Sequence, residues 1–384
     1  MLPLRLRFAA LPVSLLLLAG TAIPQSGSSP RARGLGIPFD GRPGPLNAIT
    51  DVRGVLVGHT TLISGKGKHA VRTGVTVVLP NRSIESVPGG FFRQNGNGEV
   101  TGIQYLEETG FLISPIVLTN TLSVGTAQTA VMRWSRKAKR PADPVSLPIV
   151  AETWDGWLND IDGFHIREEH VFRALDGAES GPVAEGNVGG GTGMICHGFK
   201  GGIGTSSRVL SQTAGGYVVG VLVQANQGLK RELRIAGIPV GRRIPYRSER
   251  PDQDDGSIIV VVATDAPLLP IQLRRVARRV GMGLARCGSF SGTESGDMFL
   301  AFSTQTSKVG ADGNQQICFV SESRLDEIFL ATVQATEEAI INALVAAETM
   351  TGRSGHSIPA IPHDRLRHLL EQHGRLEKKA SSEH

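Results

Sequence analysis

The sequence predicts an α/β fold of the αββα type, in which two packed β-sheets are covered on both outer faces by helices. Three observations lead to this class: predicted strands outnumber predicted helices, several strands are apolar on both faces, and the helices are amphipathic. The run 258–263 is one such apolar strand, and apolar residues recur at helical spacing in the segment that follows it. No linker interrupts residues 46–384, so we expect one domain there.

The expected elements follow one another along the chain. Short β-branched runs bounded by turn residues predict strands at 52–57, 74–79, 113–119, 147–151, 217–223, from 257 onward, at 298–302 and at 316–320. Apolar periodicity predicts helices at 98–110, 126–137, 273–284 and 325–347. The tail from Arg365 onward is rich in charged residues, and we expect it to end disordered.

The first 22 residues have the pattern of a secretory signal. Arg5 and Arg7 precede the apolar stretch 8–18, and Gly20-Thr21-Ala22 forms a small-residue cleavage site. Cleavage after Ala22 predicts a periplasmic or secreted protein with no membrane span, because no later segment reaches about 18 uninterrupted apolar residues. A retained N-terminal anchor is the alternative. Residues 23–45 are rich in Pro, Gly, Ser and Arg and predict an extended arm.

Composition excludes several classes of function. The formal net charge is only +5, and the basic clusters lack interleaved aromatic residues, so we expect no nucleic-acid partner. The three cysteines are far apart and form no Cys-x-x-Cys pair, and His-Glu-x-x-His is absent, so we expect no metal and no other cofactor; one disulfide is left open. The glycine-rich stretch 186–193 lacks the residue order of a phosphate-binding loop.

Gly256-Ser257 stands where a polar, acidic loop meets the apolar strand 258–263. Glycine leaves the preceding carbonyl unshielded and permits strained backbone angles, so the Ser257 hydroxyl could attack the bond that joins the two residues. The cut would free an α-amine whose pKa is about 8, suited to act as a general base for that hydroxyl. The alternative is an ordinary loop glycine before a serine that opens a strand.

Two further segments have side chains that could assist such a nucleophile. Ser295-Gly296-Asp297 lies at a turn before the strand 298–302, and alternation there can put Ser295 and Asp297 on the same side. Asn226 follows the strand 217–223, where its amide could donate to an oxyanion. A common Ser-Gly-Asp turn and a turn-capping asparagine are the structural alternatives.

Residues 152–160 combine three carboxylates with two of the chain's three tryptophans. A carboxylate beside an aromatic wall suits the ammonium group of a substrate with a free N-terminus, so Glu152, Trp154 and Asp155 are candidate substrate-binding residues. The alternative is a polar loop whose tryptophans pack into the core.

Taken together, these segments resemble the P1 family of N-terminal-nucleophile aminopeptidases, also called DmpA-like or L-aminopeptidase/D-esterase enzymes, which includes the β-peptidyl aminopeptidases. The similar stretches cover nearly the whole chain after the signal, in order. They are 47–52, 58–59, 152–160, 189–208, 221–228, 256–270, 295–304 and 342–355.

The resemblance implies an αββα fold of the DmpA/ornithine-acetyltransferase type. It also implies self-cleavage between Gly256 and Ser257 into chains 23–256 and 257–384, and assembly of the paired chains into a homo-oligomer, typically a tetramer. Ser257 would be the nucleophile, Ser295 and Asp297 would support it, and Asn226 would donate to the oxyanion. Trp154 stands where a tyrosine hydroxyl is expected, which weakens its assignment to the oxyanion site.

The function implied is that of an aminopeptidase that releases N-terminal residues from peptides, amides or esters through an acyl-enzyme on Ser257. An acyltransferase or amide-oligomer hydrolase of the same self-cleaving fold is one alternative, although those enzymes characteristically use threonine. A non-enzymatic exported binding protein is another. The sequence does not distinguish L-, D- and β-amino-acid substrates, because loop geometry sets the substrate pocket.

Overall fold

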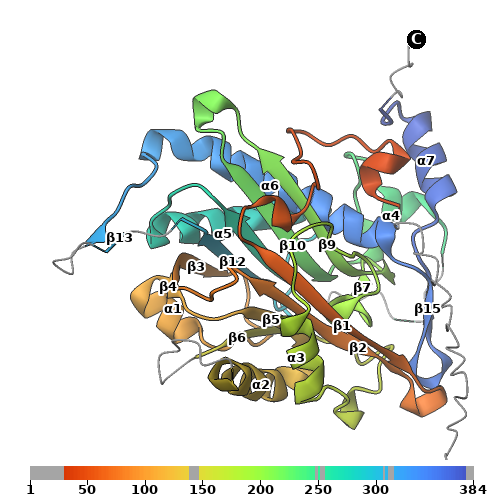
Figure 1. Ribbon diagram of the computed structural model, residues 1–384. Coiled ribbons are helices and arrows are strands. Elements are labelled where there is room, and N and C mark those ends of the chain that lie inside the picture. The colour runs from red at the N-terminus through yellow and green to blue at the C-terminus, as the bar shows by residue number, and fades with distance from the viewer. Residues whose placement is uncertain are drawn as a thin grey trace, which may run out of the picture.

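The computed structural model describes residues 30–137, 147–246, 250, 256–305, 308–309 and 315–377. The predicted signal peptide and the acidic residues 251–255 before Gly256 lie outside the described residues. Figure 1 shows two β-sheets stacked between helices, with α5 and α6 on one side and α2 and α3 on the other. This is the αββα arrangement that the sequence predicts.

The two sheets differ in size. The smaller has the order β1-β2-β5-β6 and the larger has the order β4-β3-β12-β11-β10-β9. The smaller sheet is formed by β1 (Leu56–Ser64), β2 (Val71–Leu79), β5 (Ile116–Asn120) and β6 (Ile149–Thr153). The larger is formed by β3 (Val87–Arg93), β4 (Phe111–Leu112), β9 (Gly202–Val209), β10 (Val218–Asn226), β11 (Ser257–Thr264) and β12 (Met298–Ser303). Three short hairpins complete the strands: β7 (Ile195–Cys196) with β8 (Phe199–Lys200), β13 (Lys308–Val309) with β14 (Gln315–Gln316), and β15 (Met350–Thr351) with β16 (Ser357–Ile358).

Helices cover both outer faces. They are α1 (Ile103–Thr109), α2 (Val124–Lys137), α3 (Glu168–Asp176), α4 (Val240–Arg243), α5 (Pro270–Arg286), α6 (Leu325–Ala346) and α7 (His363–Gln372). Helices α5 and α6 pack on the larger sheet, and α2 and α3 pack on the smaller one. The helical segment Glu322–Ala346, which includes α6, is long and apolar enough to span a membrane. However, 83% of its apolar 18-residue stretch is buried inside the molecule, as in a core helix.

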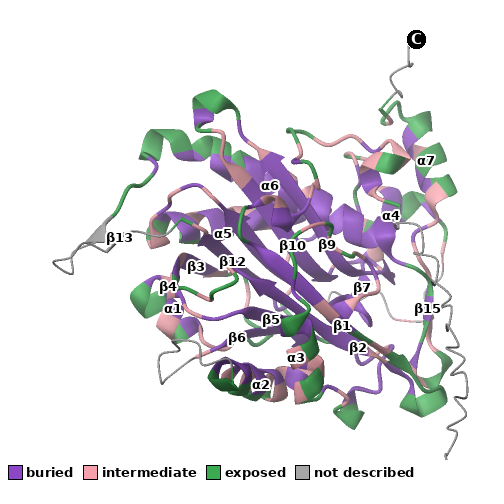
Figure 2. Cartoon of the chain, in the orientation of Figure 1, coloured by how far each residue is buried: buried purple, intermediate pink, exposed green. Residues whose placement is uncertain are grey.

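Strand β11 shows how alternation builds the layers. Ile259 and Val261 point into the core between the two sheets, whereas Ile258 and Val260 point into the core beneath α5 and α6. Both faces are therefore apolar, which is why the strand has a continuous β-branched sequence. Figure 2 shows the resulting distribution, with buried strands in the centre and exposed residues on the outer helices.

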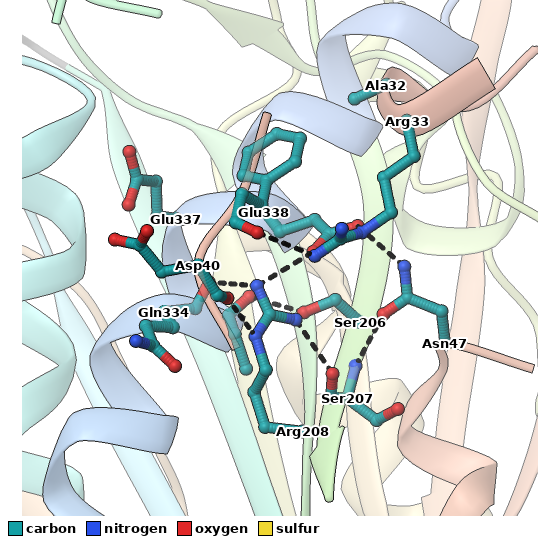
Figure 3. Close-up of polar contacts among 12 residues, drawn as sticks. Ala32, Arg33, Asp40, Asn47, Ser206, Ser207, Arg208, Gln334, Glu337 and Glu338 are labelled. Carbon is teal, nitrogen blue, oxygen red and sulfur yellow. Dashed lines mark hydrogen bonds and ion pairs between the residues drawn. The ribbon is translucent and has the colours of Figure 1, made fainter. Parts of the chain in front are cut away.

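The N-terminal arm corrects one expectation. Residues 30–45 are not merely extended, because Ala32 and Ile37 are fully buried and Arg33 contacts the body of the domain. The Arg33 and Arg208 guanidiniums both bind the buried Glu338 carboxylate, at 2.8 Å each, and the Asn47 amide donates to the same carboxylate at 2.6 Å (Figure 3). We call these four residues the Glu338 cluster. It fastens the arm to α6 and β9.

Other element predictions were wrong in detail. The expected strand 316–320 is only the two-residue β14, and 317–320 has no regular structure. The expected strand 52–57 overlaps β1 only at its last two residues. Strands β3, β4 and β9, the hairpin strands other than β14, and helices α3, α4 and α7 were not predicted. Helix α7 extends to Gln372 and buries Leu366 and Leu370, so the charged tail is ordered well beyond Arg365. The cysteines Cys196, Cys287 and Cys318 are free thiols.

Candidate active site

Ser257 and Asn226 are neighbours across two adjacent strands. Ser257 opens β11, Asn226 ends β10, and the two residues are direct partners in the antiparallel ladder. Partners of this kind project their side chains from the same face, about 5 Å apart. That face is the one between the two sheets, because Ile259 and Leu222, each an even number of residues away, pack into the inter-sheet core. Ser257 is 7% exposed.

The turn before β12 brings Ser295, Gly296 and Asp297 to the same point. Strand β12 lies parallel to β11, with Met298 opposite Ile259, so the residues just before both strands meet at one sheet end. The Gly296 N–H donates to Ser257 Oγ at 3.0 Å. The Ser295 hydroxyl donates to Asp297 Oδ1 at 2.6 Å, and the same oxygen accepts the Ile258 N–H at 3.2 Å. The four predicted residues Ser257, Ser295, Asp297 and Asn226 therefore lie together.

Asparagines that sequence reasoning missed hold this turn in place. Asn95 Oδ1 accepts the Asp297 N–H at 2.6 Å, and its amide donates to the Gly292 carbonyl at 3.0 Å. The Asn97 amide donates to the Glu294 carbonyl at 2.7 Å. The only sequence signal was the turn-forming run Asn95-Gly96-Asn97-Gly98, which indicates local backbone geometry and not a partner about 200 residues away.

Gly256 is required for space. A methyl group at position 256 would lie 1.9 Å from the Asn226 carbonyl oxygen, so no other residue fits beside the end of β10. Gly256 is not among the described glycines with positive φ, which corrects the expectation of a strained backbone there. The reason for glycine is the close approach of two backbones.

The Asn226 side chain is fixed from both ends. Its Oδ1 accepts the Ile195 N–H at 2.8 Å, and its Nδ2 donates to the Trp154 carbonyl at 3.0 Å. These partners set the orientation of the amide. An NH₂ group has two hydrogens, so one remains for a second acceptor beside Ser257.

Glu152 is the predicted carboxylate that approaches this site. It is buried at the end of β6, where Oε1 accepts the Glu99 N–H at 2.9 Å and Oε2 accepts the Thr121 hydroxyl. A methyl group at Gly98 would lie 3.1 Å from Glu152 Oε1 and 3.4 Å from Gly296 Cα. The Glu152 carboxylate and Gly296 therefore lie on either side of the space that a side chain at position 98 would fill. Burial raises the pKa of Glu152, against the two hydrogen bonds that lower it.

The other two predicted substrate-binding residues differ from Glu152. Asp155 is fully buried and bonded to the Asn159 amide at 3.0 Å, and burial raises its pKa to about 7. Its surroundings are Thr73, Asn120 and Asn159, so the structure does not bring it to Ser257. Trp154 contacts the site through its main-chain carbonyl, while its side chain is 41% exposed and lies over Gly156.

In the part of the chain that the structure describes, no group of three or more His, Cys, Asp or Glu side chains is arranged to hold a metal ion. The groups that the structure gathers at the site are a serine hydroxyl, a neighbouring Ser-Asp pair, an amide donor and a buried carboxylate. Such a set suits acyl transfer to a hydroxyl and recognition of a cation.

Comparison with known proteins gives a consistent result. The model of "Peptidase family S58" matches residues 47–358. A "Beta-peptidyl aminopeptidase BapA" of Sphingosinicella microcystinivorans is 49% identical, over 97% of this chain and 98% of that protein. A solved Burkholderia sp. beta-aminopeptidase is similar with a TM-score of 0.83 and 45% identity, covering 89% of this chain and 98% of that one. The L-aminopeptidase D-Ala-esterase/amidase of Ochrobactrum anthropi, described as a prototype serine aminopeptidase and a variant of the Ntn hydrolase fold, has a TM-score of 0.83 and 46% identity over 90% and 99% of the two chains.

Proposed function

The chain belongs to peptidase family S58 and is an aminopeptidase, and from that premise we propose that it cuts itself between Gly256 and Ser257 and then uses Ser257 as its nucleophile. The observation that carries the proposal is the position of Ser257. Its hydroxyl is held by the Gly296 N–H opposite Asn226, and the peptide bond to Gly256 directly precedes it.

Self-cleavage needs only groups that are already adjacent. Ser257 Oγ bonds to the Gly256 carbonyl carbon, the C–N bond breaks, and the Ser257 nitrogen takes up the proton that the hydroxyl loses, which makes it the free α-amine. Water then hydrolyses the ester and leaves a carboxylate on Gly256. The close packing of Gly256 on the Asn226 carbonyl supports this reaction, because it fixes the scissile bond against the end of β10.

In the proposed catalytic cycle, the same hydroxyl attacks the carbonyl that follows a substrate's first residue. The freed α-amine, whose ordinary pKa is about 7.7–8.0, takes the hydroxyl proton and returns it to the leaving amine. The Ser295–Asp297 pair supports that exchange, because these two hydrogen-bonded residues flank Gly296, whose N–H holds the Ser257 hydroxyl. Asn226 donates its remaining N–H to the oxyanion.

Glu152 gives the proposed enzyme its requirement for a free amino terminus. A methyl group at Gly98 would lie 3.1 Å from Glu152 Oε1 and 3.4 Å from Gly296 Cα, so the carboxylate lies close to the turn that holds Ser257. In the proposed complex it pairs with the ammonium group of the substrate's first residue. The raised pKa of Glu152 reflects a buried carboxylate with neutral partners, and a cation beside it restores the ionised form. Trp154, two residues after Glu152 in the chain, has an exposed indole, which we propose as an aromatic wall for the substrate.

We propose as substrates short peptides, amides or esters with a free amino terminus. The relatives named for β-peptides and the one named for L-residues and D-Ala esters are similar to this chain to nearly the same degree, at 49%, 45% and 46% identity. Hydrolysis of p-nitroanilides of L-Ala, D-Ala and β-Ala by the purified protein assigns the preference.

The variant Glu152→Gln tests the recognition step. We expect it to lose the preference for free over N-acetylated substrates, because an amide cannot pair with an ammonium. Glu99→Gln is the matched control: Glu99 is exposed, donates its backbone N–H to Glu152, and its charge raises the pKa of Glu152, so its change favours the ionised Glu152 and should leave the preference intact. An unchanged preference in Glu152→Gln would rule out this role.

We also propose export and self-association. The charged and apolar pattern of residues 1–22 supports a signal that is removed after Ala22, and the resemblance to the DmpA-like enzymes supports assembly of the processed chains into a homo-oligomer. Sequencing of the mature N-terminus and light scattering of the purified protein test these two points. A mature protein that retains Met1 would contradict export by cleavage, and a single pair of chains in solution would contradict the oligomer.

A further inference from the structure

Lys200, in the short hairpin β7–β8, is fully buried and holds its ammonium group against main-chain carbonyls. Its Nζ donates to the Met194 carbonyl at 2.8 Å, the Gly201 carbonyl at 2.8 Å and the Gly191 carbonyl at 3.2 Å. Among the described residues no carboxylate pairs with it, and the titratable group that acts on it is the Cys196 thiol. A buried charge without a counter-ion is costly, which calls for a reason beyond filling space.

The carbonyl at 194 leads directly to the active site. The Met194 C=O and the Ile195 N–H belong to one peptide group, and the Ile195 N–H donates to Asn226 Oδ1 at 2.8 Å. A positive charge on the carbonyl side of a peptide makes its N–H a stronger donor. That N–H in turn withdraws electrons from the Asn226 carboxamide, and so strengthens the Nδ2–H groups at its other end.

We infer that Lys200 is a positioning residue for catalysis, which orients and polarises Asn226 through the Met194–Ile195 peptide. The inference rests on the proposed function in one respect, because it assumes that Asn226 donates to the oxyanion. Lys200 touches neither the substrate nor Ser257. It acts through three successive groups: ammonium, peptide and side-chain amide.

The surroundings of Lys200 keep its charge sensitive to pH. Burial lowers the pKa of Lys200 to about 7, and Cys196 is the titratable neighbour that acts on it. Burial raises the pKa of that thiol to about 12, so it remains neutral and donates to Gln227 Oε1. His197, in the same hairpin, faces the Leu229 carbonyl. Lys200 therefore loses its charge as the pH rises through about 7, and the polarisation of Asn226 should weaken in the same interval.

A double-mutant cycle between Lys200→Met and Asn226→Ala tests the inference. All kcat values are expressed per mole of processed chain that begins at Ser257, measured by mass spectrometry. We expect Asn226→Ala to lower kcat about 100-fold and Lys200→Met to lower it about tenfold with little change in KM. The double variant should match Asn226→Ala within about twofold, because Lys200 acts only through Asn226.

Lys230→Met is the control, because the half-buried Lys230 donates its ammonium to the Gly241 and Ile244 carbonyls and lies over the Phe199 ring of the same hairpin. It therefore tests whether the loss of any lysine packed on that hairpin lowers kcat. Its change should lower kcat less than about twofold. Equal losses from Lys200→Met in the presence and absence of Asn226 would overturn the inference while leaving the proposed function intact. If Asn226→Ala has no effect, the oxyanion assignment fails first and the inference fails with it.

A second measurement needs no Lys200 variant and decides the question if Lys200→Met does not fold. The ratio of wild-type to Asn226→Ala kcat is followed from pH 6 to 9. Titration of the Ser257 α-amine affects both proteins and cancels in the ratio. We expect the ratio to fall as the pH rises through about 7, and a ratio that stays constant would overturn the inference.

Discussion

The Glu338 cluster and the charges near Ser257 are both buried, but they are compensated differently. Two guanidiniums and an amide bind the Glu338 carboxylate. Glu152 and Lys200, in contrast, have neutral partners among the described residues: a hydroxyl and an N–H for the first, three carbonyls for the second. Burial raises the pKa of Glu152 and lowers that of Lys200, and these neutral partners do not offset its effect.

This difference separates structural charges from functional ones. Breaking a compensated pair leaves one charge buried alone, so its main effect is on folding. A buried group with a shifted pKa near the reacting hydroxyl is poised to meet a charge that arrives with the substrate or develops during the reaction. The predictions below test whether the two sets of residues separate stability from activity in this way.

The largest effect is expected at Ser257. Ser257→Ala removes the proposed nucleophile for both self-cleavage and hydrolysis, so the chain should remain uncut and kcat should fall by at least about 10⁴-fold. Denaturing electrophoresis and an anilide assay measure the two effects. Ser303→Ala is the control, because Ser303 is buried in β12 and its hydroxyl bonds to the Ala266 carbonyl, away from the site. Activity that survives in Ser257→Ala would remove the basis of the proposed mechanism.

At the Glu338 cluster the expected loss is in stability. Arg208→Met removes one of the two guanidiniums that bind the fully buried Glu338 carboxylate. Because part of that buried charge then has no partner, we expect the free energy of unfolding to fall by about 3–5 kcal/mol. Urea unfolding followed by circular dichroism measures this loss. The kcat per processed site should change less than about twofold. A large loss of kcat with unchanged stability would contradict the division between the two sets of charges.

Gly98 tests the space between Glu152 and Gly296. In Gly98→Ala the new methyl group would lie 3.1 Å from Glu152 Oε1, so we expect KM to rise about tenfold with a smaller change in kcat. Gly96→Ala is a close control, because a methyl group there has nothing within 4 Å. If both variants have the same KM, the substrate does not enter beside Gly98.

The smallest expected effect is on the pH dependence of kcat/KM. Because the pKa of Glu152 is raised, its carboxylate is lost at a higher pH than that of an ordinary glutamate, whose pKa is 4.5. Both this carboxylate and the unprotonated Ser257 amine are needed. In the wild type the logarithm of kcat/KM should therefore fall with a slope approaching two at acid pH, and in Glu152→Gln with a slope of one. Equal slopes would show that Glu152 does not ionise in the binding step.

Local sequence patterns predicted much of this molecule. The apolar run of β11 and the spacing of α5 predicted a strand that feeds a covering helix, and the αββα class followed and was confirmed. The membership in an aminopeptidase family was confirmed as well. Strand β9 was missed because Gly202-Ile203-Gly204-Thr205-Ser206-Ser207 has glycines where other backbones approach closely, Gly186 at Gly202 and helix α6 at Gly204, and these glycines lower its apparent β propensity.

The rest of the site depends on contacts that are distant in sequence. Ser257, Asn226, Ser295 and Asp297 could be proposed because each lies at a strand end, but Asn95 and Lys200 reach the site only through tertiary contacts. The sequence predicted the same role, binding of the substrate ammonium, for Glu152 and Asp155. Only burial and hydrogen-bond partners distinguish them, since Asp155 faces Asn159 while Glu152 faces Gly98. The roles of all these residues remain predictions until the variants are measured.

The central claim is that cleavage before Ser257 creates the catalytic amine. Intact-mass analysis of the purified wild-type protein, on the same sample that is assayed for peptide hydrolysis, tests it most directly. We expect two chains, one ending at Gly256 and the other beginning at Ser257, with activity proportional to the cleaved fraction. A fully active protein whose chain is uncut between Gly256 and Ser257 would contradict it.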